Sequence, residues 1–186
     1  MPTLLSIDIG IKNLGWALIE YDSDFAEDDM CIDFGIYVID DKKSSKESVV
    51  SRRCKRINEF FEMIKDKCDT ASIDKIVIER QVNNNTQAMS IMYALVMKAF
   101  SIFPQEHIFI FDPKLKFTFY HEEYDTKNKA HKRKSIQKVR SLFEKYYQEL
   151  LSTFDSFQKK DDISDAINQG ITLLHMKGLL HQVDAL

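Results

Sequence analysis

The sequence predicts an α/β fold with one five-stranded mixed sheet, an antiparallel meander plus parallel strands, flanked by helices. Apolar and polar residues alternate through three consecutive segments near the N-terminus, a pattern typical of strands joined by short connections. Beyond residue 45, segments with helical spacing alternate with short apolar runs, an order that favours parallel strands with crossover helices. The chain has 186 residues and no internal repeat or Pro/Gly-rich linker, so we expect a single domain over residues 1–186.

Five short apolar segments between turn residues are expected to be strands. The first places Ile7 and Ile9 on one face and Asp8 on the other, because the side chains of a strand alternate. The fourth contains the apolar run 76–78, which suits burial on both faces. The five strands are expected over residues 4–9, 15–21, 32–39, 73–79 and 107–111.

Four further segments carry apolar residues at three- and four-residue steps, the pattern of amphipathic helices. The first is expected over residues 46–68, and Pro104 ends the second. The inward-facing residues are Val50, Cys54, Ile57, Phe61, Ile64 and Cys68 in the first helix, Met89, Met92, Val96, Ala99 and Phe103 in the second, Ile136, Val139, Phe143, Tyr146 and Leu150 in the third, and Ile163, Ala166 or Ile167, Ile171 and Leu174 in the fourth. The stripe of the second helix belongs to the core or to a dimer interface, and we favour the core. Residues 114–126 have no period and are expected to form a surface loop.

Composition excludes several classes of protein. Glycine occurs five times and is absent from residues 36–169, so neither a Walker loop nor a Rossmann turn can be built, and we expect no nucleotide cofactor. No window of 18 apolar residues is present, so we expect no membrane-spanning segment. The three cysteines form no CxxC pair, which indicates reduced thiols in an intracellular compartment and no zinc site.

Charge is distributed unevenly, although the net charge is only −3. Residues 20–33 carry seven acids and no lysine or arginine, whereas residues 126–143 carry seven bases and no acid. A second basic stretch covers residues 42–56. Phosphate binding depends on the local field, so the weak net charge does not exclude nucleic acid. A charge run is more often a solvated face, and charge alone leaves both readings open.

Four acids stand where the hydrophobic pattern does not require them. Asp8 lies within a strand, where it must be paired or coordinated unless that face is exposed. Glu79 ends the most apolar strand and lies beside Asp8 if the two strands are neighbours; the alternative is an ordinary ion pair with Arg80. Asp162 and Asp165 project from one face of the last helix, although acids near a helix N-terminus also favour its dipole. Together the four could hold two divalent ions, Mg²⁺ or Mn²⁺, because hard cations prefer oxygen ligands.

Four segments follow one another along the chain: SIDIGIKNLGWALIEY, IVIERQ, HKRKS and KKDDISDA. In this combination and order they resemble the RuvC-like Holliday junction resolvases, most of all the poxvirus type. The resemblance covers nearly the whole chain. It implies a ribonuclease H-like fold and a homodimer that resolves four-way DNA junctions by symmetric paired nicks, in DNA recombination and concatemer resolution. It also implies an intracellular location, in the host-cell cytoplasm or in the virion.

The resemblance assigns roles to individual residues. The catalytic, metal-binding acids fall on Asp8, Glu79, Asp162 and Asp165 and imply two ions per active site, Mg²⁺ with Mn²⁺ as a substitute. A lysine at the scissile phosphate falls on Lys132 or Lys134, and the form of the basic run favours Lys132. DNA contacts are expected from Lys12, Arg80, Gln81, Lys129, Lys132, Arg133, Lys134 and Lys138. The five histidines share no spacing and receive no role.

Three other functions are consistent with parts of this pattern. One is another ribonuclease H-fold nuclease that acts on RNA–DNA hybrids or on other branched DNA. A second is a junction-binding protein without catalysis, although all four acids are present. A third is the sugar kinase and actin ATPase superfamily, whose first phosphate loop also has the form DxGxxN found at residues 8–13. The glycine gap removes the second phosphate loop that this superfamily needs.

Overall fold

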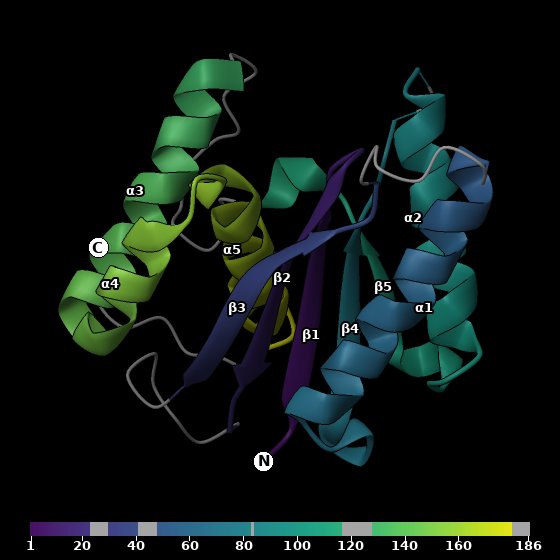
Figure 1. Ribbon diagram of the computed structural model, residues 1–186. Coiled ribbons are helices and arrows are strands. Elements are labelled where there is room, and N and C mark those ends of the chain that lie inside the picture. The colour runs from purple at the N-terminus through teal and green to yellow at the C-terminus, as the bar shows by residue number, and fades with distance from the viewer. Residues whose placement is uncertain (23–29, 41–47, 83, 117–127, 180–186) are drawn as a thin grey trace.

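The five strands form one sheet in the order β3-β2-β1-β4-β5 (Figure 1). The structure is a computed structural model, and it describes residues 1–22, 30–40, 48–82, 84–116 and 128–179. The strands are β1 (Thr3–Ile9), β2 (Asn13–Glu20), β3 (Cys31–Val38), β4 (Ile73–Glu79) and β5 (Ile108–Phe111). β1 pairs antiparallel with β2, and β2 with β3, whereas β4 runs parallel to both β1 and β5. The predicted mixed α/β sheet is therefore confirmed.

Helices cover both faces of the sheet (Figure 1). They are α1 (Val49–Lys67), α2 (Thr86–Phe100), α3 (Asn128–Tyr146), α4 (Gln148–Ser156) and α5 (Lys160–Met176). α1 and α2 pack on one face, and α3, α4 and α5 lie on the other. In the described residues no helix is long and apolar enough to cross a membrane, and all three cysteines carry free thiols.

The central strand β1 divides its side chains between the two layers as the alternation predicts. Ile7 and Ile9 pack with α1 and α2. Ser6 lies on the opposite face, where its Oγ donates a hydrogen bond of 2.6 Å to the carbonyl oxygen of Ala166 in α5. Gln169 of α5 also donates to the backbone carbonyls of Ile7 and Val77, at 3.2 and 3.3 Å. These bonds fix α5 across β1 and β4, on the face where Asp8 points.

The first helix differs from its predicted pattern in its opening turns. Both Val50 and Cys54 were expected to face the core. Instead, Val50 is 69% exposed and Cys54 is also exposed. Arg53 instead turns inward, and its guanidinium pairs with Asp40 at 3.0 Å. An ion pair at the edge of the core replaces the apolar contact that the three- and four-residue spacing predicts.

The third predicted helix is divided in two. It ends at Tyr146, so Leu150, expected on its inner face, belongs to α4. The helix breaks because Tyr147 adopts φ −136° and ψ 53°, which buries its ring at the edge of Phe143. Its hydroxyl also accepts a hydrogen bond from the backbone N–H of Met30, at 3.1 Å. This tertiary contact has no counterpart in the local pattern.

The connection after β5 is only partly described, and the prediction of a surface loop over residues 114–126 fails at its start. The 3₁₀ turn η4 (Pro113–Leu115) leads directly to Lys116, whose side chain is 1% exposed. Residues 117–126 lie outside the described part of the chain. The α2 stripe is mixed: Met92 is buried, Met89 and Val96 are half-buried, and the helix ends at Phe100 before the buried Phe103.

Gly15 allows α5 to approach the sheet beside Asp8, its partner across β1 and β2. A Cβ atom on Gly15 would lie 2.2 Å from the backbone oxygen of Asp162, far inside van der Waals contact. A side chain at this position therefore requires the start of α5 to move away.

We predict that Gly15→Ala lowers the free energy of unfolding by about 1–3 kcal/mol, the scale of overpacking against atoms that cannot move aside. The measurement is urea denaturation in the presence of chelator. Gly35→Ala is the matched control, because its Cβ would meet the Trp16 side chain at 2.9 Å rather than backbone, and a side chain can shift. Equal losses in the two variants would show that the Asp162 backbone does not depend on Gly15.

Candidate active site

Asp8 and Glu79 lie side by side at one edge of the sheet. β1 and β4 run parallel and pair through Ile7 and Ile78, so the residue that follows each of these points past the same sheet edge. The two strand-end acids are therefore neighbours, as predicted. Asp165, one turn into α5, reaches the same place from the helical layer.

The three carboxylates meet on the ammonium group of Lys116. Its Nζ lies 2.9 Å from Asp8 Oδ1, 2.9 Å from Glu79 Oε1 and 3.2 Å from Asp165 Oδ2. Thr172 of α5 donates a hydrogen bond of 3.0 Å to the Lys116 backbone carbonyl and fixes the main chain of this residue. A buried cation thus joins β1, β4, α5 and the segment after β5.

Charge is not balanced within this cluster, because three carboxylates surround one ammonium group. Burial raises the pKa of Asp8 well above its usual value, and Glu79 and Asp165 raise it further, whereas Lys116 opposes them. Burial alone would lower the pKa of Lys116, but Asp165, Asp8 and Glu79 outweigh it and hold that pKa well above its ordinary value. The lysine therefore stays charged, and the cluster keeps an excess of negative charge that favours a further or stronger cation.

In two of the carboxylates, the oxygen that does not contact Lys116 accepts a hydrogen bond from an uncharged side chain. Gln81 Nε2 donates to Glu79 Oε2 at 2.6 Å, and Ser135 Oγ donates to Asp165 Oδ1 at 2.5 Å. Asn168 Nδ2 in turn donates to Ser135 Oγ at 2.9 Å. These bonds orient the remaining oxygens of Glu79 and Asp165 toward one point.

Asp162 lies at the border of this cluster rather than within it. It is half-buried in the first turn of α5, and within the described residues it makes no ion pair with Lys116. Burial raises its pKa, and the neighbouring Asp161 raises it further. Lys159 and Lys132 act on the pKa of Asp162 in the opposite direction but do not outweigh these causes.

The lysine among the carboxylates is neither of the two that the sequence motifs predict. Lys132 is 54% exposed and pairs with Asp161, one turn before Asp165. Lys134 is half-buried on α3. Lys116 was missed because its segment has no periodicity. A signal did exist: the segment leaves β5 at the same sheet edge as Asp8 and Glu79, since β4 and β5 are parallel.

His131 is a second group near the site to which the sequence pattern gives no role. It is buried on α3, and its burial lowers its pKa, although the nearby Asp165 acts in the opposite direction. Its electrostatic neighbours also include Lys116 and Glu79. The imidazole therefore lies within electrostatic range of the carboxylate cluster, on the α3 side.

The residues predicted to contact DNA occupy different environments. Arg80 pairs with Asp112, and Gln81 is engaged by Glu79, so both are tied to the edge of the carboxylate cluster. The remaining positions are Lys12, exposed in the β1–β2 turn, Lys132 and Arg133, exposed on α3, and Lys134 and Lys138, half-buried on α3. The side chain of Lys129 lies outside the described residues.

The donor set suits a hard divalent cation, because three carboxylates offer oxygen to one point. Among the described residues, no three His, Cys, Asp or Glu side chains stand close enough to hold a metal ion in their present arrangement. The ammonium group explains this spacing, since its contacts are about 3 Å long, whereas Mg²⁺ binds oxygen at about 2.1 Å. The three carboxylate oxygens are suitable ligands for a divalent cation, and their present separation is the one that suits the Lys116 ammonium group.

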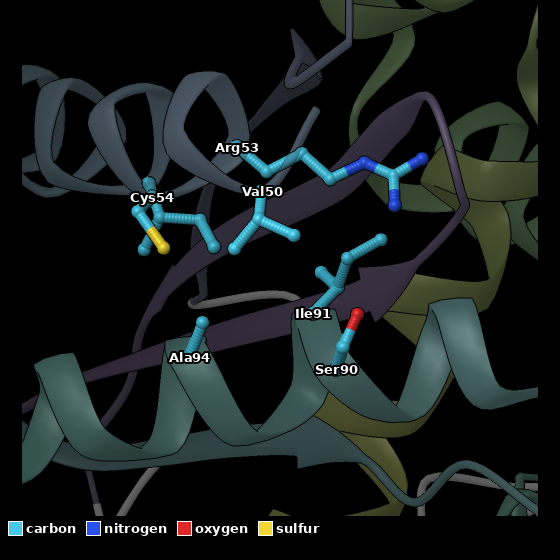
Figure 2. A pocket seen from close by; sticks show the side chains of 7 residues that line it. Val50, Arg53, Cys54, Ser90, Ile91 and Ala94 are labelled. Carbon is cyan, nitrogen blue, oxygen red and sulfur yellow. The ribbon is translucent and has the colours of Figure 1, made fainter. Parts of the chain in front are cut away.

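A hollow between α1 and α2 is unrelated to this chemistry. It has a volume of about 40 Å³ and is lined mainly by apolar groups, with Arg53 and Ser90 as polar members. Figure 2 shows Val50 and Cys54 of α1 facing Ile91 and Ala94 of α2 across it. It lies on the face of the sheet opposite Asp8 and has room for little more than water.

Comparison with solved structures identifies the fold. The Fowlpox virus resolvase in complex with Holliday junction DNA matches with a TM-score of 0.64 at 17% identity, covering 94% of this chain and 98% of that one. The yeast mitochondrial Holliday junction resolvase Ydc2 matches at 0.69 and 16%, covering 96% and 82%. Thermus thermophilus RuvC in complex with a Holliday junction substrate matches at 0.59 and 12%, covering 95% and 97%. The ribonuclease H-like fold expected from the resemblance is therefore confirmed.

Sequence comparison gives the family. No curated protein sequence matches the chain. The model of the family described as the poxvirus A22 protein matches residues 3–177, nearly the whole length. The expected resemblance to resolvases of the poxvirus type is thus confirmed, and the chain belongs to the poxvirus A22 protein family.

Proposed function

We propose that this protein is a metal-dependent, structure-selective endonuclease that resolves four-way DNA junctions by symmetric paired nicks. The observation that carries the proposal is the meeting of Asp8, Glu79 and Asp165 at one sheet edge. Membership of the poxvirus A22 protein family and a fold shared with three Holliday junction resolvases support this assignment.

Asp8, Glu79, Asp162 and Asp165 would hold the divalent ions, two per active site. Bound ions would supply an activated water and stabilise the charge of the leaving oxygen. Gln81 and Ser135 keep Glu79 and Asp165 oriented, so little reorganisation is needed when DNA arrives. Lys116 contacts three of these carboxylates and Lys132 pairs with the adjacent Asp161, so either can place positive charge beside the scissile phosphate.

The exposed lysine and arginine side chains of α3 form the DNA-binding surface next to the carboxylate cluster. Lys132 and Arg133 are exposed near the start of this helix. Lys132 pairs with Asp161 of α5, which places the basic surface beside the carboxylates. Phosphate backbone bound to this surface would pass the active site, so binding and cleavage use adjacent regions of the protein.

A homodimer suits this activity, because a four-way junction has two equivalent strands to cut and each chain carries one carboxylate cluster. α2 offers a surface for a second copy. Tyr93, Met97 and Phe100 recur along one face and are 56%, 68% and 44% exposed. Lys98 is the only charged residue of this helix. Large apolar side chains on a nearly uncharged helix are typical of self-association.

We predict that Asp8→Asn and Asp165→Asn each lower the rate of junction cleavage by roughly 10²-fold or more, the scale of losing one electrostatic contact with a transition state. Removal of metal by chelator gives the same loss. Junction binding persists in both variants, because the basic surface of α3 is unchanged. The measurement is cleavage of a labelled four-way junction, with a linear duplex and an RNA–DNA hybrid alongside.

Each substrate in this assay decides between the proposed function and an alternative. Paired symmetric nicks in the junction alone support the proposal. Cleavage of the hybrid instead would assign the same site to another ribonuclease H-fold nuclease. Tight junction binding without any cleavage would indicate a binding protein.

We predict that Lys132→Ala and Arg133→Ala each weaken junction binding and each reduce the slope of log K against log salt by about 1, since each removes one phosphate contact. The measurement is a salt titration of binding in the presence of chelator, which prevents cleavage. Lys65→Ala on α1 is the control, because this lysine lies on the opposite face of the sheet. An unchanged slope in both α3 variants would remove α3 from the DNA surface.

We predict that Met97→Glu converts the dimer to a monomer, because a charge at the centre of the exposed face formed by Tyr93, Met97 and Phe100 is desolvated when two copies meet. The measurement is sedimentation equilibrium. Met176→Glu is the control, since Met176 is 50% exposed near the end of α5 on the other layer. A dimer that survives in Met97→Glu would place the interface elsewhere.

A further inference from the structure

Lys116 occupies the point toward which each of three carboxylates turns one oxygen. The contacts are nearly equal, 2.9 Å to Asp8, 2.9 Å to Glu79 and 3.2 Å to Asp165. The ammonium group is almost fully buried, with 1% of the side chain exposed. A cation in this position neutralises part of a charge cluster that would otherwise repel itself.

Glu79 and Asp165 each have only one carboxylate oxygen that points toward the centre of the cluster. The second oxygens of Glu79 and Asp165 accept hydrogen bonds from Gln81 and Ser135 at 2.6 and 2.5 Å. Glu79 and Asp165 therefore present one oxygen each to a shared cation, and Lys116 already holds those two. A divalent ion that binds the same oxygens must compete with the ammonium group, because each of these oxygens already contacts Lys116 Nζ and a second cation at the same point would be repelled by it.

The main chain of Lys116 is anchored independently of its side chain. Its backbone N–H donates to the Pro113 carbonyl at 3.3 Å, and its carbonyl accepts from Thr172 at 3.0 Å. Asp112 caps the same turn through the backbone N–H of Lys114, at 3.0 Å. Departure of the ammonium group thus requires rotation of the side chain, while the backbone can stay in place.

We propose that Lys116 is a resident counter-ion of the metal-free site, and that a divalent cation binds by displacing its ammonium group from Asp8, Glu79 and Asp165. The site then alternates between an ammonium-filled and a metal-filled state. This exchange rests on the proposed function, because it assumes that these carboxylates bind the metal. It predicts an effect that cleavage does not report: metal binding exposes Lys116.

The first test labels amines in the unmodified full chain. An amine-reactive ester is applied briefly with chelator, with Mg²⁺ or with Mn²⁺, and the modified lysines are quantified by mass spectrometry. Lys116 is expected to react slowly with chelator and about tenfold or more faster with either ion, since local exposure controls the reactivity of a buried group. Lys75 is the internal control, because it pairs with Asp74 on β4 away from the site, and its rate stays constant.

The second test measures the affinity for Mn²⁺ alone by calorimetry. Lys116→Met is expected to bind Mn²⁺ about tenfold or more tightly than the wild type, because a binding-competent site no longer has to be vacated first. Lys75→Met keeps the wild-type affinity. If Lys116→Met unfolds in chelator, Mn²⁺ restores its folding transition, because the metal takes over the neutralising role of the ammonium group.

The outcomes separate the exchange from the proposed function. Binding of Mn²⁺ to the wild type while Lys116 stays protected, or equal or weaker binding by Lys116→Met, overturns the exchange and leaves the metal site intact. Absence of Mn²⁺ binding by both proteins overturns the exchange together with the metal site. Increased labelling of Lys116 with metal, in a protein that cuts no junction, supports the exchange and contradicts only the proposed activity.

Discussion

The structure depends on one electrostatic constraint, which is the concentration of three carboxylates, the buried Asp8 and the half-buried Glu79 and Asp165, around a single buried cation. Asp8, Glu79 and Asp165 come from three different elements, and each would be costly to bury without a partner. Lys116 compensates part of this charge and thereby connects β1, β4, α5 and the segment after β5. The three carboxylates can in this way come together in the fold with Lys116 as their counter-ion.

The packing around the cluster serves to hold it in place. Gly15 lets the backbone of Asp162 approach within a distance that no side chain would allow, so α5 begins beside Asp8. Hydrogen bonds from Ser6 and Gln169 fix the same helix across the sheet. The position of Asp165 is thus a consequence of contacts made along α5 rather than of its own charge. A rigid frame of this kind keeps reactive groups preorganised.

The sequence predicts much of this arrangement because local pattern determines it. Strand alternation is sufficient to place Asp8 opposite the α1–α2 layer, and parallel pairing brings it to Glu79. The fate of Lys116 could not be predicted in the same way, since its burial depends on charges from distant parts of the chain. Tyr147 and Arg53 are similar cases: each departs from helical expectation because a tertiary partner, Met30 or Asp40, satisfies a polar group.

The most direct test of this account is anomalous diffraction from crystals of the full chain that contain Mn²⁺. We expect a manganese peak coordinated by Asp8, Glu79 and Asp165, with the Lys116 ammonium group withdrawn from all three carboxylates. A manganese ion bound elsewhere, with the three Lys116 ion pairs intact, would contradict it and would make the lysine a permanent structural counter-ion.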